Sequence, residues 1–275
     1  MTVTVSTARR LAESRPVKLL FVGDVVGGLG RRTLASLLPG IRDAHRPDFV
    51  VVNGENAAGG VGITQKTARE LLEMGADAIT LGNHAFRHRE VYELLDREER
   101  IVRPANYPKG SPGRGHTVVE NDGARLGVVN LSGLVFLQAV RSPFAEADAV
   151  LAELRDRADA VLVDMHAEAT SEKVAMGWHL DGRVTACVGT HTHVPTSDAR
   201  VLPGGTAYVT DVGMTGPRGG VIGVKREQAL ERFVMLTNVR FETSDEDPWL
   251  NAVLIEADAG GRATSVKQLL MPAEL

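Results

Sequence analysis

The chain has 275 residues, with 43% hydrophobic and 24% charged side chains and a formal net charge of −4, values typical of globular proteins with one or two domains. The slightly acidic balance excludes a broad basic surface for nucleic acid, and the single cysteine excludes an internal disulfide and a cluster of thiolate metal ligands. No apolar run reaches the roughly 18 residues of a membrane-spanning helix, and the low cysteine content fits a reducing compartment, so we expect a cytoplasmic protein.

The first third of the chain alternates strand-like and helix-like patterns. Residues 1–16 contain no apolar signal-peptide core, and we expect a disordered extension there, before a single domain at 17–275. Apolar runs predict buried strands, and apolar residues at helical spacing predict helices between them. The strands are expected at 17–23, 49–52 and 76–81, and the helices at 31–45, 64–74 and 88–96. Thr64 is a candidate N-cap, and Gly75 ends that helix.

The remainder of the chain has a turn-rich stretch at 103–115 and then further strands and helices. A hairpin is expected around 121–123, where Asn-Asp-Gly separates two strand-like runs. Helices are expected at 144–155 and 171–178. Strands are expected at 160–164, 184–188, 200–202, 207–210, 221–224, 252–256 and 265–269. This pattern indicates one α/β domain of mixed sheets with helices outside.

Polar residues that can bind a metal recur just after the predicted strands. They are Asp24, Glu55, Asn56, Asn83, His84, His166, His191 and His193. Because the carboxyl ends of parallel strands meet at one edge of a sheet, we expect these side chains to gather in one crevice.

Each of these signals has a plainer interpretation when it is taken alone. The glycine-rich stretch at 23–30 suggests a dinucleotide loop, but it does not fit the G-x-G-x-x-G pattern. Asn83 alone is more often a turn residue, and His84 alone is more often a surface histidine. The pair His191 and His193 is stronger, because residues two apart on an extended segment point the same way.

The chemistry of the donors indicates more than one metal ion. Aspartate, glutamate and histidine suit borderline divalent metals without any sulfur ligand. The number of donors exceeds what one tetrahedral zinc needs. Two metals sharing a carboxylate would account for the surplus and would activate a water for in-line attack on a phosphate ester. The histidines at 45, 88, 116 and 179 lack this context, and we expect them to be structural or surface residues.

Several motifs resemble a known family. Gly-Asn-His at 82–84 and Gly-Thr-His-Thr-His at 189–193 resemble signatures of the calcineurin-like metallophosphoesterases. Longer blocks resemble one bacterial branch, the YmdB-type phosphodiesterases, over nearly the whole chain from residue 17 onward. These blocks lie at 21–27, 52–60, 80–84, 103–108, 164–173, 180–184 and 210–217. Val26 stands where the wider superfamily has a metal-binding histidine, which is a feature of this branch.

The resemblance implies a fold and a metal centre. The fold is an α/β metallophosphoesterase sandwich, in which two mixed β-sheets are flanked by helices in the order α/β/β/α. The centre holds two metal ions, iron and manganese, with zinc as the alternative. The implied ligands of the first metal are Asp24, Glu55, Asn56 and His193, and those of the second are Glu55, Asn83, His166 and His191. Glu55 would bridge, and His84 would protonate the leaving oxygen.

The implied function is a phosphodiesterase that hydrolyses 2′,3′- or 3′,5′-cyclic nucleotides through a metal-activated hydroxide. A nucleotide- or RNA-responsive regulatory protein with incidental turnover is one alternative, and a phosphomonoesterase or amide hydrolase is another. The sequence leaves the physiological substrate and the metal pair open. The oligomeric state also stays open, although apolar C-terminal strands offer a way for copies to pair.

The surroundings of the site also admit two interpretations. Arg103, Arg114 and Lys173 are candidates for meeting the phosphate or base, but solvated surface positions are the stronger expectation. Either Asp164 or Glu168 is expected to orient the imidazole of His166, or else to be a simple polar strand end.

Overall fold

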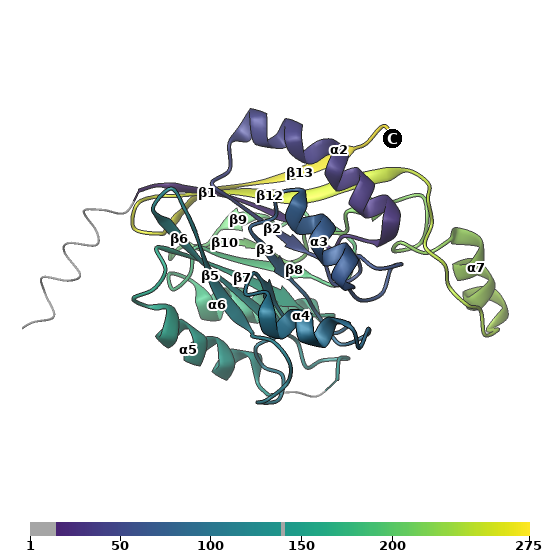
Figure 1. Cartoon of the computed structure of the whole chain (residues 1–275), viewed down its shortest axis with the longest axis horizontal. Helices are drawn as coiled ribbons and strands as arrows, with labels where there is room; N and C mark the ends of the chain where they lie inside the picture. Colours follow the sequence, from purple (N-terminus) through teal and green to yellow (C-terminus); the bar gives the residue numbers. More distant parts are fainter. Residues whose placement is uncertain (1–14, 139–140) are drawn as a thin grey trace, which may run out of the picture.

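The computed structural model describes residues 15–138 and 141–275, and it has two β-sheets packed face to face with helices on both outer sides (Figure 1). Of the predicted extension at 1–16, residues 1–14 lie outside the described part. In the described part, the first sheet has the order β11-β12-β1-β2-β3-β4, with β13 on β12. Its strands are β1 (Val17–Val22), β2 (Phe49–Asn53), β3 (Ala78–Thr80), β4 (Ile101–Val102), β11 (Gly216–Pro217), β12 (Pro248–Ala257) and β13 (Ala263–Pro272).

The second sheet has the order β5-β6-β7-β8-β10-β9 among the same described residues. Its strands are β5 (His116–Asn121), β6 (Ala124–Ser132), β7 (Ala160–His166), β8 (Ala186–Thr190), β9 (Arg200–Val201) and β10 (Ala207–Val209). The helices are α2 (Gly27–His45), α3 (Gln65–Glu73), α4 (Val91–Arg97), α5 (Pro143–Leu154), α6 (Thr170–Leu180) and α7 (Arg226–Met235). Apolar residues of α2, α3 and α4 pack on the first sheet, and those of α5 and α6 pack on the second. This is the predicted α/β/β/α sandwich.

Alternation along β1 explains why its apolar run is continuous. Leu19 and Phe21 belong to the core between the two sheets. Leu20 and Val22 belong to the core beneath the helices. Successive strand residues point to opposite faces, so a strand that is covered on both faces needs apolar residues at every position. The sequence pattern that predicted a buried strand therefore has its cause in the two-sided packing.

Local signals at both ends of α3 and at the turn between β5 and β6 have the structure that the sequence predicted. Thr64 caps α3 with a capping box, in which its side chain and that of Thr67 each accept from the other residue's backbone N–H. Gly75, at φ 104°, ends this segment. Asp122 and Gly123 both have positive φ between β5 and β6, as a two-residue hairpin requires.

The predicted strand at 221–224 is wrong. Val221 and Val224 bridge each other across a tight turn, in which Ile222 and Gly223 have positive φ. Helix α7 follows and projects from the body of the molecule (Figure 1). Sequence periodicity missed α7 because its large apolar side chains do not form a buried face; Phe233 and Val234, for example, are 72% and 73% exposed.

Among the described residues, no helix is long and apolar enough to cross a membrane.

Candidate functional site

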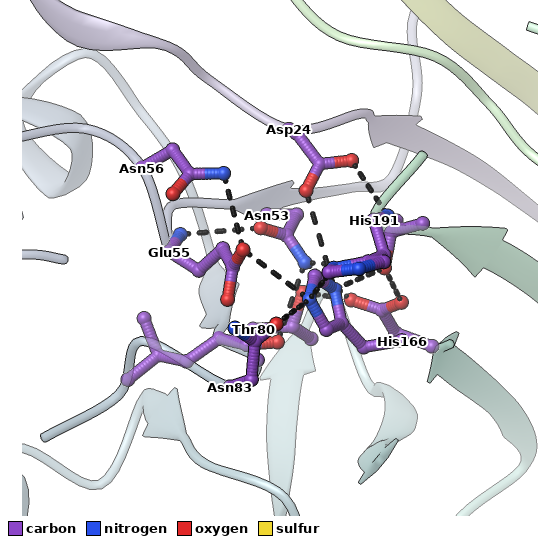
Figure 2. A network of polar contacts seen from close by, with 12 residues as sticks. Asp24, Asn53, Glu55, Asn56, Thr80, Asn83, His166 and His191 are labelled. Atoms are coloured by element: carbon purple, nitrogen blue, oxygen red, sulfur yellow. Dashed lines mark hydrogen bonds and ion pairs between the residues drawn. The ribbon is translucent and has the colours of Figure 1, made fainter. Parts of the chain in front are cut away.

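Strand ends from both sheets deliver the predicted site residues to one place. Asp24, Glu55 and Asn83 follow β1, β2 and β3 of the first sheet, whereas His166 ends β7 and His191 follows β8 of the second. Figure 2 shows these side chains pointing toward one another. The crevice therefore lies between two packed sheets. Sequence reasoning placed it along the edge of a single sheet, and this part of the expectation was wrong.

The centre of the cluster is formed by Glu55, His166 and His191, whose donor atoms all lie within 4.8 Å of one another. Nε2 of His166 is 3.2 Å from Oε1 of Glu55 and 3.0 Å from Nδ1 of His191. The side-chain oxygen of Asn83 is 2.9 Å from the same Nε2 atom. One nitrogen thus faces a carboxylate, an amide oxygen and a second imidazole.

A second group of potential metal ligands lies on the other side of Glu55. Oδ1 of Asp24 is buried and has no hydrogen-bond donor among the described residues. Nε2 of His193 is 3.9 Å from this oxygen. The Asn56 amide nitrogen is 3.0 Å from Nε2 of His193 and 3.1 Å from Oε1 of Glu55. Two ligands of one metal, each at about 2.0–2.2 Å from it, lie roughly 3–4 Å apart, so the 3.9 Å between Oδ1 of Asp24 and Nε2 of His193 fits a divalent cation.

A chain of hydrogen bonds beneath the site fixes the orientation of His166. Nδ1 of His166 lies 2.8 Å from the Thr190 hydroxyl, which donates to Asp164 at 2.7 Å. This hydroxyl therefore accepts from Nδ1–H, and Nε2 is left facing the donor cluster. Asp164 also accepts from Asn53 and Thr80 of the first sheet, so its carboxylate joins the two sheets.

Of the two carboxylates expected to orient His166, Asp164 and Glu168, only Asp164 does so, and it does so indirectly. Asp164 orients His166 through Thr190, as described above. Glu168 instead reaches Nε2 of His191 at 3.1 Å.

The charges of the cluster shift the pKa values of its members. Burial opposes ionisation of Glu55, but His166 and His84 outweigh it and hold the Glu55 pKa well below its usual value. Burial likewise disfavours a charged His166, but Glu55, Asp24 and Asp164 raise its pKa to about 9. Burial and the charge of His166 lower the pKa of His191 to about 3. Burial raises the pKa of Asp24. Metal ligation requires neutral imidazoles and ionised carboxylates, which a bound cation would favour here.

The His191–His193 segment has a conformation that the sequence did not predict. Both histidines have positive φ, 100° and 67°, so the segment is a twisted loop and the extended geometry was wrong. Positive φ is costly for residues other than glycine. Asp211 holds the loop, because its carboxylate accepts from the backbone N–H and the hydroxyl of Thr192, at 3.1 and 2.8 Å.

Lys173 completes this support. Its ammonium group lies 2.6 Å from Oδ2 of Asp211, and both side chains are 1% exposed. The expectation that Lys173 is a solvated surface residue was therefore wrong. Arg103 is also buried, and its guanidinium donates to backbone carbonyls of the 104–113 loop. Sequence reasoning missed Asp211, although it follows an apolar strand-like run and lies in the 210–217 block of the family resemblance.

His84 lies at the rim of the cluster and is held from one side. Its Nδ1 is 2.9 Å from the side-chain oxygen of Asn56 and 3.2 Å from Oε1 of Glu55. No described residue hydrogen-bonds Nε2, and the side chain is 34% exposed. The ring is thus oriented by the cluster while one nitrogen faces outward.

Gly82, the glycine of the Gly-Asn-His motif, has a steric role. A Cβ atom on Gly82 would lie 2.3 Å from both Oε2 of Glu55 and Nε2 of His166. Any larger residue would push these side chains out of the cluster.

Comparisons with known proteins identify the family. A family model described as YmdB-like protein matches residues 20–269. The chain belongs to the YmdB-like family. A Bacillus subtilis (strain 168) member named 2′,3′-cyclic-nucleotide 2′-phosphodiesterase is 45% identical over 256 residues, which cover 93% of this chain and 97% of that protein.

Solved structures extend the likeness. A solved structure described as a novel phosphatase from Mycoplasma pneumoniae has a TM-score of 0.88 and 34% identity, covering 94% of both chains. A 5′-nucleotidase precursor from Thermus thermophilus has a TM-score of 0.54 at 16% identity, covers 94% of this chain and 54% of its own, and shows the fold alone. The predicted family, metallophosphoesterase sandwich and general enzyme class are confirmed.

Proposed function

We propose that the chain is a metal-dependent phosphodiesterase that uses two metal ions to hydrolyse cyclic nucleotides, with 2′,3′-cyclic nucleotides as its preferred substrates. The observation that carries the proposal is the orphaned, buried Oδ1 of Asp24, which faces a cluster of carboxylate, amide and imidazole donors. A buried acceptor without a donor is costly unless a cation satisfies it. The name of the Bacillus subtilis relative supports the cyclic substrate.

The proposed ligands divide between the two flanks of Glu55. The first metal is assigned to Asp24, Glu55, Asn56 and His193, and the second to Glu55, Asn83, His166 and His191. Asn56 must turn its amide by about half a rotation to ligate, because its oxygen now faces His84. Iron and manganese, with zinc as the alternative, suit a set of oxygen and nitrogen donors without sulfur.

His84 is the proposed general acid. Bound metals would supply Lewis-acid polarisation of the phosphate and of the attacking water. The leaving alkoxide still needs a proton, and general acid catalysis typically contributes about 10²- to 10⁴-fold. His84 is suited to this role because Glu55 holds Nδ1 at 3.2 Å, which leaves Nε2 free to meet the leaving oxygen.

The test is hydrolysis of bis-p-nitrophenyl phosphate by the purified protein with Mn²⁺. His84→Ala should lower kcat for adenosine 2′,3′-cyclic phosphate, whose leaving alkoxide needs a proton, by about 10²- to 10⁴-fold, and should affect the nitrophenyl diester far less because nitrophenolate leaves without a proton; metal analysis should still find about two ions per chain. His88→Ala is the matched control, because His88 bonds only the carbonyl of Val61 among the described residues and should keep wild-type turnover. A wild-type protein that binds two metals and hydrolyses no phosphodiester would contradict the proposal.

A phosphomonoesterase is the second candidate, and the description of the Mycoplasma pneumoniae structure as a phosphatase favours it. Parallel assays with p-nitrophenyl phosphate and its diester decide between them. The diesterase proposal requires the larger kcat/KM on the diester.

A further inference from the structure

The molecule has a cavity beside His84 that the proposed chemistry does not use. Its volume is about 500 Å³, and Asn83 and His84 form one wall. Phe86 and Tyr107 also line it, and their ring centroids are 5.6 Å apart with an angle of 44° between the planes. The cavity thus joins the candidate site to an aromatic wall.

The polar part of the lining is available to a ligand. Arg87 and Ser111 line the same cavity, and no described residue hydrogen-bonds either side chain. Phe86 is held in place from behind by Tyr92, whose ring meets it edge-on at 5.4 Å. An aromatic surface backed by a fixed ring, with polar groups at its rim, suits a flat heterocycle that carries hydrogen-bonding edges.

We propose that this cavity binds the nucleobase of the substrate, with Phe86 and Tyr107 as the stacking surface. The inference rests on the proposed function and follows from the position of the acid. When a 2′,3′-cyclic phosphate opens at the 2′ oxygen, the leaving oxygen is on C2′, and the base is on the adjacent ring carbon, C1′. The group that protonates this oxygen must therefore stand near C2′, next to the ring carbon that carries the base. His84 stands at the cavity lined by Phe86 and Tyr107.

A second cavity also borders the site, and the same reasoning excludes it. It lies beside His193 and is lined by Trp249, whose ring face is covered by the guanidinium of Arg218 at 4.1 Å. Its lining includes His193, a proposed ligand of the first metal, but not His84, and Arg218 already covers a face of its aromatic ring. The base therefore stacks on Phe86 and Tyr107, and not on Trp249.

Stacking sets the expected specificity. Every base has an aromatic face, so stacking recognises the presence of a base with little preference among bases. The wild-type enzyme should show a KM for adenosine 2′,3′-cyclic phosphate about 10-fold or more below that for 1-O-methylribose 2,3-cyclic phosphate, which carries no base.

The experiment compares these two substrates in the holoenzyme. Phe86→Leu should reduce the KM difference between them to less than about threefold, whereas Phe86→Tyr should retain it. Trp249→Leu is the matched aromatic control in the other cavity and should leave the difference as in the wild type. A thermal melt of each variant checks that it is folded.

Three results would overturn the base site. They are a wild-type enzyme that does not distinguish the two substrates, a Phe86→Leu variant that keeps the full difference, and a difference that only Trp249→Leu abolishes. If the wild type hydrolyses no phosphodiester, the proposed function fails by itself. Calorimetric binding of adenosine 2′,3′-cyclic phosphate then still tests the cavity, because Phe86→Leu must weaken it by about 10-fold.

Discussion

Replacing Lys173 with methionine removes the ammonium group that lies 2.6 Å from Oδ2 of Asp211. The carboxylate would then stay in the interior without this counter-charge, since it is 1% exposed. Removing one partner of a buried pair typically costs about 3–5 kcal/mol. Hydrogen bonds from Thr192 and Gly213 would remain on the carboxylate. We therefore expect the lower end, about 3 kcal/mol of unfolding free energy, or a fall in Tm of roughly 6–12 °C.

A double-variant cycle measures this interaction by denaturant unfolding. Lys173→Met and Asp211→Asn should each destabilise the protein. The double variant should be at least about 1 kcal/mol more stable than the sum of the two single effects predicts, because it contains no unpaired charge. Lys66→Met is the surface control: Lys66 is 84% exposed and 3.9 Å from Glu70, so a change within about 0.5 kcal/mol is expected.

The Lys173–Asp211 pair also supports the loop that carries His191 and His193, because Asp211 accepts two hydrogen bonds from Thr192 in this loop. Lys173→Met should therefore lower the number of metal ions bound per folded chain, and Lys66→Met should not. Additive effects within about 0.5 kcal/mol, or a Lys173→Met variant of wild-type stability and metal content, would refute this reasoning.

Four further outcomes are expected. Gly82→Ala should lose bound metal and activity, because its Cβ would lie 2.3 Å from Glu55 and His166; Gly40→Ala, where nothing lies within 4 Å, should lose neither. Burial raises the pKa of Cys187 to about 12, so thiol reagents at pH 8 should label it only after unfolding. Because folding raises the pKa of the thiol from 9.0 to about 12, unfolding free energy should fall as the pH rises from about 9 to about 12 in wild type, and less steeply in Cys187→Ala. Chelation with EDTA should lower Tm, which excess Mn²⁺ should restore, because a ligand that binds only the native state stabilises it.

Local sequence signals predicted the elements whose causes are local. The apolar run of β1 reflects burial on both faces, and Thr64 caps α3 through atoms within three residues of itself. Those signals fail at α7, whose apolar side chains stay exposed, and at 221–224, where a turn replaces the predicted strand. Periodicity reports burial, so it cannot identify a helix whose apolar residues face outward.

The sequence by itself determined the donors and their places after the strands, because strand ends are encoded by short apolar runs followed by polar residues. Motif resemblance added the family. Only the tertiary structure decided that the donors come from two packed sheets, that His191 and His193 lie on a loop with positive φ, and that buried Lys173 and Asp211 hold this loop. These features depend on contacts between residues far apart in the chain, and a local pattern does not record which distant side chains will meet.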